Sequence, residues 1–563
     1  MPGSSRVPIS LRDLTSMKAD ARKRNPRIFF NLDLVRNLVF AWFVLRHFRR
    51  AVRQIRGRGI LGTLHSLYLS FLRLSYGAFL SLPGVRGKVQ AQVDAALKQI
   101  EDKLVPKGPG VNRYLTLPKN GWAEEAIKEE LGKLSELKHA SWEKGQVSGA
   151  VYHGGDELLD LQSEAYRKFA VSNPLHPDVF PGVRKMEAEI VAMVGAMFNA
   201  PANAGGITTS GGTESILIAC LSARNKGYRE RGVTEPEMII PITAHAAFHK
   251  AGHYFGIKVH EVAIDPLTLK VNTRAVARLI NFNTILLVGS APNFPHGIID
   301  DIAALSRLAL RHNIPLHVDC CLGSFLVPFL DRAGFPTTPF DFRLKGVTSI
   351  SCDTHKYGFA PKGNSVVVFR TKKLRQYGYF ISATWTGGVY ASPSLAGSRA
   401  GSLIAGTWAS LMKLGEDGYV SSCREIIGAA KIIEGHIREK FHPDLYVLGE
   451  PLLSVVAFSS KTLDIYDVAD EMSSLGWHLN ALQDPPAIHI AVVKPTVKHV
   501  DNFVRDLGKA VEAAKKKEAD AKKEGKKRPK GQAAALYGVA GSLPDKRIVD
   551  AMAAGFIDTL YKA

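Results

Sequence analysis

Short apolar runs alternate with helical patterns from Pro118 onward. Five runs are rich in β-branched residues and have the length of buried strands: Met238 to Ile242, Thr284 to Gly289, Pro315 to Val318, Val347 to Ser351 and Ser365 to Phe369. Arg184 to Phe198 has the pattern of an amphipathic helix. Strands that alternate with helices predict an α/β fold with a mostly parallel central sheet, in which ligands bind at the carboxyl ends of the strands.

The N-terminal region has a different pattern. Its two apolar stretches are Leu38 to Phe48 and Ile60 to Leu82, and only the second reaches the roughly 20 residues of a membrane span. That stretch contains His65 and Arg73, so a helix that lies in the headgroup region is an alternative to a transmembrane helix. Six arginines at the end of the first stretch and between the two stretches suit an anionic membrane surface: Arg46, Arg49, Arg50, Arg53, Arg56 and Arg58. We expect a membrane-associated helical segment with an open number of crossings, and a soluble docking helix is the alternative.

The net charge of +21 is concentrated at two places. Met1 to Arg58 contains fourteen Lys and Arg against three Asp and Glu, and Lys515 to Lys530 contains nine against three. Because this charge belongs to a tail and an insert, without interleaved aromatic residues, we expect no nucleic-acid partner. Val511 to Gln532 is predicted to be a solvated helix or a disordered loop. The five cysteines are odd in number and fit no zinc-ligand spacing, which predicts a reducing compartment and no metal site.

Two motifs follow predicted strands and contain candidate catalytic residues. Ser351-Cys-Asp-Thr-His-Lys-Tyr-Gly358 places Lys356 at the start of a loop. Burial beside His355 is expected to keep this lysine partly unprotonated, as an amine that bonds to an aldehyde requires. His317-Val-Asp-Cys-Cys-Leu-Gly323 ends a strand at Asp319, and a carboxylate there can keep a pyridine nitrogen protonated. Each motif alone is weak, since most lysines are solvated and aspartates are common in turns.

Two further features complete a pattern. Gly211, Gly212 and Thr213 precede an apolar helix and offer backbone N–H groups and the positive helix end to a phosphate, although many helices begin this way. His245 follows a predicted strand and is a candidate to stack on a pyridine ring, although a lone histidine is usually an ordinary loop residue. The order phosphate cup, stacking histidine, aspartate, lysine predicts pyridoxal 5′-phosphate, held by Lys356 as a Schiff base.

This ordered combination resembles the group II decarboxylase branch of the fold-type I pyridoxal-phosphate enzymes, and within it the sphingosine-1-phosphate lyase family. The resemblance extends from about Leu115 to the C-terminus, apart from the Lys-rich insert. It rests on five strings: Val147-Ser-Gly-Ala-Val-Tyr152, Asn173-Pro-Leu-His-Pro-Asp178, Thr354-His-Lys-Tyr-Gly-Phe-Ala-Pro-Lys-Gly363, Gly397-Ser-Arg-Ala-Gly401 and Tyr537-Gly-Val-Ala-Gly-Ser542.

The resemblance implies a clamp for the substrate phosphate, made of a cation and several donors: Tyr152, Asn173, His176 and Lys362. Turn structure beside Pro174 and Pro177 is the alternative explanation for Asn173 and His176. It also implies that Tyr390 and Ser398 contact the cofactor phosphate of a second subunit, so a homodimer with shared active sites is expected.

The expected reaction is cleavage of the C2–C3 bond of a sphingoid base 1-phosphate to a fatty aldehyde and phosphoethanolamine. The base for the C3 hydroxyl stays open among Lys356, His355 and the substrate phosphate. The resemblance implies an endoplasmic reticulum membrane location, with the catalytic domain facing the cytosol. The alternatives are an amino-acid decarboxylase on the same fold and a non-catalytic lipid-binding membrane scaffold.

We expect the chain to divide into four parts. Residues 1–110 form a basic region with membrane-associated helix or helices, and 111–195 are an N-terminal extension of the enzyme body. Residues 196–410 form the large cofactor-binding domain. Residues 411–563 form a smaller C-terminal α+β domain that contains the Lys-rich insert at 511–532.

Overall fold

The computed structural model describes residues 26–108, 111–524 and 547–562, and the chain separates into the units Met1–Tyr68 and Leu69–Ala563. Helix α2 (Pro26–Leu80) is interrupted at Gly59, whose φ of 74° is a left-handed conformation that glycine adopts without strain. No helix within the described ranges combines the length and the apolar content that a membrane crossing requires. The string Tyr537 to Ser542 and the end of the Lys-rich segment lie outside the described residues.

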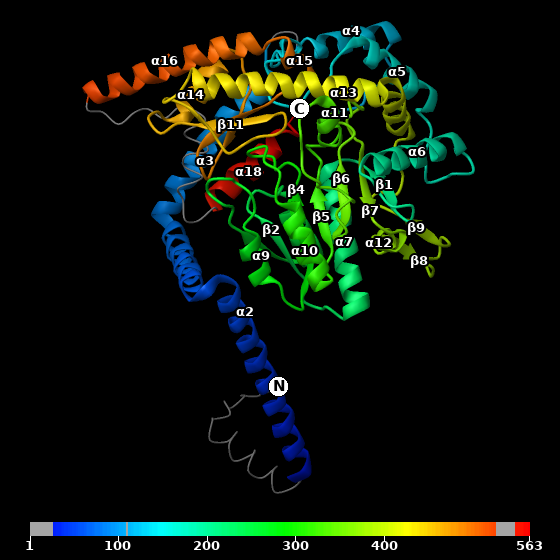
Figure 1. Cartoon of the computed structure of the whole chain (residues 1–563), viewed down its shortest axis with the longest axis vertical. Helices are drawn as coiled ribbons and strands as arrows, with labels where there is room; N and C mark the ends of the chain where they lie inside the picture. Colours follow the sequence, from blue (N-terminus) through cyan, green and yellow to red (C-terminus); the bar gives the residue numbers. More distant parts are fainter. Residues whose placement is uncertain (1–25, 109–110, 525–546, 563) are drawn as a thin grey trace, which may run out of the picture. The chain divides into compact units, whose positions relative to one another are not determined.

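A seven-stranded sheet forms the centre of the second unit, in the order β1-β7-β6-β5-β4-β2-β3 (Figure 1). Its strands are β1 (Gly205–Thr209), β2 (Glu237–Pro241), β3 (Lys258–Val262), β4 (Thr284–Ser290), β5 (Leu316–Asp319), β6 (Val347–Cys352) and β7 (Ser365–Phe369). Only β7 runs antiparallel to its neighbours. The mostly parallel sheet and all five predicted strands are confirmed. Sequence reasoning missed the two edge strands, β1 with its GGITT sequence and the partly exposed β3.

Helices cover both faces of this sheet. Met238 and Ile240 belong to the core beneath α7 (Gly212–Arg231) and α8 (Ala247–Phe255). Ile239, which points to the opposite face, belongs to the core with α6 (Pro181–Met197) and α10 (Ile302–His312). This alternation follows from the period of two along a strand, and it explains why strands buried on both faces are continuously apolar.

Helix α13 (Gly401–Glu439) leads to a four-stranded antiparallel sheet in the order β10-β11-β13-β12. The strands are β10 (Tyr446–Val447), β11 (Val455–Ser459), β12 (Asn480–Leu482) and β13 (Ala487–Ala491). Helix α14 (Ile465–Ser474) packs against β13 and against α16 (Val500–Glu524). The described part of the Lys-rich segment is therefore helical.

Shorter elements surround these two sheets. Helix α3 (Pro83–Leu104) packs against α18 (Arg547–Thr559), and α5 (Asp156–Phe169) packs along α13. A two-stranded hairpin is formed by β8 (Phe380–Ser382) and β9 (Tyr390–Ser392). The remaining helices among the described residues are α4 (Glu124–Ser135), α9 (Thr273–Leu279), α11 (Leu330–Ala333), α12 (Lys372–Gln376), α15 (Lys494–Val497) and the 3₁₀ turns Trp142–Lys144 and Val327–Phe329.

Candidate active site

Lys356 lies in the loop after β6, and its ammonium forms a buried ion pair. Its Nζ is 2.9 Å from Asp353 Oδ2, and the lysine side chain is 21% exposed. Burial lowers the pKa of Lys356, but the Asp353 carboxylate outweighs burial and the resulting pKa lies above the ordinary value. The expectation that burial leaves this amine partly unprotonated is therefore wrong, because the sequence does not reveal the buried counterion. Burial raises the pKa of Asp353, but the charges of Lys356 and His355 lower it by more, so the pKa of this carboxyl lies below its usual range.

Asp319 is the last residue of β5 and pairs in register with Ser351 of β6. Its Oδ1 accepts hydrogen bonds from the Cys321 backbone N–H at 3.1 Å and from Ser351 Oγ at 3.3 Å, and Oδ2 takes part in neither bond. Behind it, the ring nitrogens of His317 lie 2.9 Å from Ser349 Oγ and 3.1 Å from Ser351 Oγ. Burial lowers the pKa of His317 to about 4, so this histidine is neutral at physiological pH. The carboxylate is thus held in one orientation at the sheet edge.

The predicted phosphate cup lies against the lysine loop. A Cβ on Gly212 would come within 2.8 Å of the Asp353 carboxylate and of Cys321 Sγ, and one on Gly211 within 3.5 Å of the His355 ring. Burial raises the pKa of the Cys321 thiol, and the charges of Asp319, Asp353 and Lys356 also act on it. The structure therefore brings the cup, the aspartate and the lysine together at the carboxyl edge of the sheet, where the 20-residue helix α7 begins.

Several buried polar atoms at this edge have no hydrogen-bond partner within the described part of the chain. They include Thr243 Oγ1 after β2, Asn293 Nδ2 after β4 and Asp353 Oδ1 after β6. Buried polar atoms are nearly always paired, so their concentration at one edge fits a polar ligand there. Together with the glycine cradle, these atoms fit pyridoxal phosphate. Sequence reasoning missed Thr243, Asn293 and Asp353, although each lies within four residues of the end of a predicted strand.

The two candidate histidines differ in their surroundings. His355 Nδ1 donates to the Asn364 carbonyl at 2.6 Å, because a carbonyl can only accept, and this leaves Nε2 as the acceptor nitrogen. Burial lowers the pKa of His355, which favours this neutral form. His245 has an exposed ring whose Nδ1 accepts from the Ala247 backbone N–H at 3.1 Å. Within the described residues, no hydrogen bond or ion pair joins His245 to Lys356 or Asp319.

Lys362 and Tyr152, both predicted to bind the substrate phosphate, are in contact. Lys362 Nζ lies 4.5 Å from the centre of the Tyr152 ring and donates to the His355 carbonyl at 3.4 Å. Desolvation by the surrounding loop and the nearby Lys356 charge lower the pKa of Lys362 to about 8, although its side chain keeps exposed surface. The pair borders a cavity of about 300 Å³ with largely apolar walls, which include Trp142, Val151, Leu158, Leu159 and Phe359.

Asn173 and His176 lie on a separate loop. Asn173 Nδ2 donates to Ser398 Oγ at 3.0 Å, and its Oδ1 accepts from the Arg399 backbone N–H at 3.2 Å. The Arg399 guanidinium forms an ion pair with Glu187 of α6. His176 is exposed. Among the described residues, no hydrogen bond or ion pair joins this loop to Lys362 or Tyr152.

Tyr390 and Ser398 follow each other along the hairpin segment. The Tyr390 ring lies 6.2 Å from the rings of Phe380 and Trp385. Exposed apolar side chains surround it on this segment: Phe380, Ile381, Trp385, Val389 and Leu395. Glu214 connects this segment to the phosphate cup, because it accepts hydrogen bonds from the backbone N–H groups of Ser210 and Leu395.

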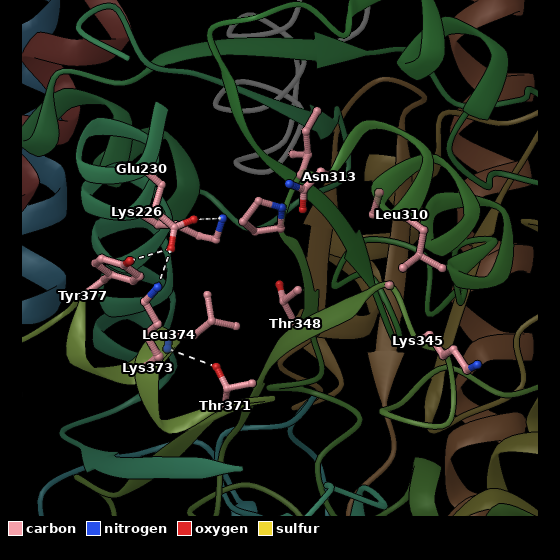
Figure 2. A pocket seen from close by; sticks show the side chains of 14 residues that line it. Lys226, Glu230, Leu310, Asn313, Lys345, Thr348, Thr371, Lys373, Leu374 and Tyr377 are labelled. Carbon is pink, nitrogen blue, oxygen red and sulfur yellow. Dashed lines mark hydrogen bonds and ion pairs between the residues drawn. The ribbon is translucent and has the colours of Figure 1, made fainter. Parts of the chain in front are cut away.

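A second cavity, of about 280 Å³, lies at the other end of the strands (Figure 2). Glu230 is bound there by Lys226 at 2.6 Å, Lys373 at 3.1 Å and the Tyr377 hydroxyl at 2.6 Å, and these contacts lower its pKa to about 2. Glu230 is thus fully paired by two lysines and a hydroxyl, and the residues lining this cavity include none of the predicted site residues. We interpret this group as a structural ion-pair cluster.

The fold and the site define a fold-type I pyridoxal-phosphate enzyme of the decarboxylase type. Residues 135–461 match the pyridoxal-dependent decarboxylase conserved domain, so pyridoxal phosphate is the cofactor. The chain belongs to the sphingosine-1-phosphate lyase family. It is 51% identical to the Saccharomyces cerevisiae sphingosine-1-phosphate lyase, over 86% of this chain and 81% of that protein. It is 42% identical to the Mus musculus sphingosine-1-phosphate lyase 1, over 88% of this chain and 86% of that protein.

Solved structures agree with this assignment. The Burkholderia pseudomallei sphingosine-1-phosphate lyase superposes with a TM-score of 0.71 at 42% identity, over 75% of this chain and 98% of that one. The Lactobacillus brevis glutamate decarboxylase superposes with a TM-score of 0.62 at 21% identity, over 72% of this chain and 95% of that one. At that identity the second likeness supports the fold alone.

Proposed function

We propose that the chain is a pyridoxal-phosphate-dependent lyase that cleaves the C2–C3 bond of sphingoid base 1-phosphates, including sphingosine and dihydrosphingosine 1-phosphate. The products are a long-chain fatty aldehyde and phosphoethanolamine, as sphingolipid catabolism requires. One observation supports the proposal most directly: the Lys362–Tyr152 pair adjoins the loop that contains Lys356. A cation that bonds to that loop, with an aromatic ring beside it, suits a substrate whose phosphate is on the carbon next to the one that bears the reacting amine.

When bound, the cofactor supplies an electron sink for the carbanion left at C2. Lys356 would hold it, Asp319 would keep its pyridine nitrogen protonated, and the backbone of Gly211 and Gly212 would hold its phosphate. When it is free of the cofactor, the Lys356 amine is protonated beside Asp353 and would be the group that delivers a proton. His355 Nε2 has a lone pair for the proton of the C3 hydroxyl. The candidates for the base are Lys356, His355 and the substrate phosphate. The acceptor nitrogen Nε2 favours His355 among them.

The loop with Asn173 and His176 is proposed to complete the clamp. Gly401 N–H, at the start of α13, donates to the Ser172 carbonyl at 2.9 Å. A Cβ on Gly363 would lie 2.9 Å from Leu403 in the first turn of the same helix. One helix end thus supports both the Asn173 loop and the Lys362 loop, which is the support for their acting on one phosphate.

The decisive experiment is product analysis with a phosphorylated long-chain base, comparing the native enzyme with Lys356→Ala. We expect equal amounts of fatty aldehyde and phosphoethanolamine from the native enzyme, and no aldehyde from the variant. Borohydride should fix the cofactor to the native chain at Lys356. Carbon dioxide release from amino acids without aldehyde formation would reject the lyase in favour of a decarboxylase. A protein that takes up no cofactor would support the scaffold alternative.

We also propose a homodimer in which Tyr390 and Ser398 reach the partner's cofactor phosphate. The exposed apolar side chains on the hairpin support this, because so many on one short segment of a soluble domain indicate an interface. A groove of about 620 Å³ lined by α6, β1 and Arg399 adjoins the same segment. Mixing two inactive variants, Lys356→Ala and Tyr390→Phe, should give mixed dimers with one intact site of two, so that a random equal mixture regains up to about a quarter of native activity. No recovery, with mixed dimers demonstrated by mass, would argue against shared sites.

We propose that α2 attaches the enzyme to the endoplasmic reticulum membrane with the catalytic domain in the cytosol. Phe40, Trp42, Phe43 and Phe48 are exposed on this helix, and Arg49 and Arg50 lie beside them. The full chain should float with vesicles that contain anionic phospholipid, and a chain that starts at Pro83 should not. Protease treatment of sealed microsomes should digest the catalytic domain; protection would contradict the orientation.

A further inference from the structure

Tyr357 directly follows the proposed cofactor lysine and is buried, with 1% exposure. Its hydroxyl bonds to Ser454 Oγ at 2.6 Å and donates to the Val492 carbonyl at 2.8 Å. Val492 N–H donates to the Ser454 carbonyl at 2.8 Å, so the two positions are neighbours just outside β11 and β13. A side chain of the lysine loop is therefore bonded to the end of the C-terminal sheet.

The ring of Tyr357 touches the proposed substrate clamp. It meets the Tyr152 ring edge to face, with centroids 4.8 Å apart and planes at 78°. Tyr152 also lies beside the Lys362 ammonium, which is 4.5 Å from its ring centre. The Tyr152 carbonyl accepts from the Lys494 backbone N–H at 3.1 Å, two residues beyond the partner of Tyr357. Both tyrosines are thus attached to the segment Val492–Lys494.

We propose that Tyr357 is a positioning residue for the substrate-phosphate clamp. Its hydroxyl fixes its ring, the edge-to-face contact fixes the plane of Tyr152, and that plane fixes where the Lys362 ammonium lies. Both aromatic pairing and a cation over a ring depend on orientation, so a rotated Tyr357 displaces the cation. This inference rests on the proposed role of Tyr152 and Lys362, and it makes the C-terminal sheet a part of substrate recognition.

The test is Tyr357→Phe in the holoenzyme, which removes the hydroxyl and keeps the ring. We expect the KM for the phosphorylated base, and the inhibition constant of phosphoethanolamine, to rise about fivefold, the factor associated with one hydrogen bond, because the two bonds of the hydroxyl act on Lys362 only through Tyr152. The kcat should stay within about twofold of native, and the absorption spectrum of the bound cofactor should not change. An unchanged KM, or an equal loss in kcat and a changed spectrum, would overturn the proposal.

Tyr419→Phe is the matched control. Tyr419 is also buried, at 4% exposure, and its hydroxyl donates to the Gly358 carbonyl of the same loop at 2.8 Å. Its ring stacks on Phe329 and Phe359 rather than on Tyr152. This variant should lose stability and keep the native KM. A rise in KM equal to that of Tyr357→Phe would mean that loosening the loop is the cause, and would refute positioning through Tyr152.

Two more variants separate the failure of this inference from failure of the clamp. In a Tyr152→Leu background, Tyr357→Phe should add no further rise in KM, since the intermediary is gone; a full additional rise would refute the route. Lys362→Met should raise KM by itself. A raised KM in Lys362→Met with an unchanged KM in Tyr357→Phe refutes the positioning role alone, whereas an unchanged KM in both also refutes the clamp.

Discussion

The pKa of Lys362 leads to a quantitative prediction for substrate binding. Burial and the Lys356 charge hold this pKa at about 8, so the side chain is about 90% charged at pH 7 and about 10% charged at pH 9. A phosphate monoester, with a second pKa of about 6, stays dianionic over this range. If Lys362 binds that dianion, kcat/KM, which reports the free enzyme, should fall about tenfold from pH 7 to pH 9.

Two substitutions assign the effect to this residue. Lys362→Arg keeps the charge at every accessible pH, so its kcat/KM should be flat from pH 7 to pH 9. Lys362→Met removes a charge-assisted hydrogen bond worth about 1.5–3 kcal/mol, so kcat/KM at pH 7 should fall by roughly 10- to 100-fold. The same variant should show no further decline at pH 9, because the titrating group is absent.

The assay is aldehyde release at subsaturating substrate from pH 6.5 to 9.5, at constant ionic strength. Lys373→Met is the control, since Lys373 belongs to the ion-pair cluster of Figure 2 and hydrogen bonding to Glu230 raises its pKa. This control should reproduce the native profile. The reasoning is refuted if native kcat/KM does not fall by pH 9.5, or if a tenfold fall persists in Lys362→Arg.

Three further predictions follow from the site. Asp353→Asn removes the counterion of Lys356, so burial should lower the pKa of this lysine and borohydride should trap the cofactor at lower pH. Breaking the buried ion pair should also reduce the stability of the apoenzyme by roughly 3 kcal/mol. An unchanged pH midpoint of cofactor trapping would contradict this reasoning. His317 has a folded pKa of about 4 against 6.5 unfolded, so its contribution to stability is present above pH 6.5 and is lost as pH falls toward 4. Between pH 7.5 and pH 5, the free energy of unfolding of His317→Gln, measured with urea, should therefore fall by about 2 kcal/mol less than that of the native protein. Equal falls in the two proteins would exclude His317 as the source of this pH dependence. Gly212→Ala should weaken cofactor binding at least about tenfold by equilibrium dialysis, because its Cβ has no room. Gly428→Ala, with nothing within 4 Å, should bind normally; equal weakening in both variants would rule out the cradle.

The sequence predicted the sheet and the location of the chemistry for a local reason. Lys356 and Asp319 lie at the carboxyl ends of buried strands that contain β-branched residues, and the carboxyl ends of parallel strands meet at one edge. The glycines before α7 were recognisable because a glycine pair before an apolar helix is a local signal. Strand β1 escaped notice because its buried GGITT sequence is made of small and polar residues, and β3 because a partly exposed strand lacks a continuous apolar pattern.

The sequence alone determined the class of enzyme, because its short motifs occur in the chain order that is typical of that class. Only the tertiary structure decided the protonation of Lys356, because the ionisation of a buried amine depends on the distance to Asp353 and on exclusion of water. Tertiary structure also joined Tyr357 to Val492, 135 residues away along the chain. No local sequence pattern contains such a contact, since it arises only when the lysine loop of the central sheet packs against the end of the C-terminal sheet.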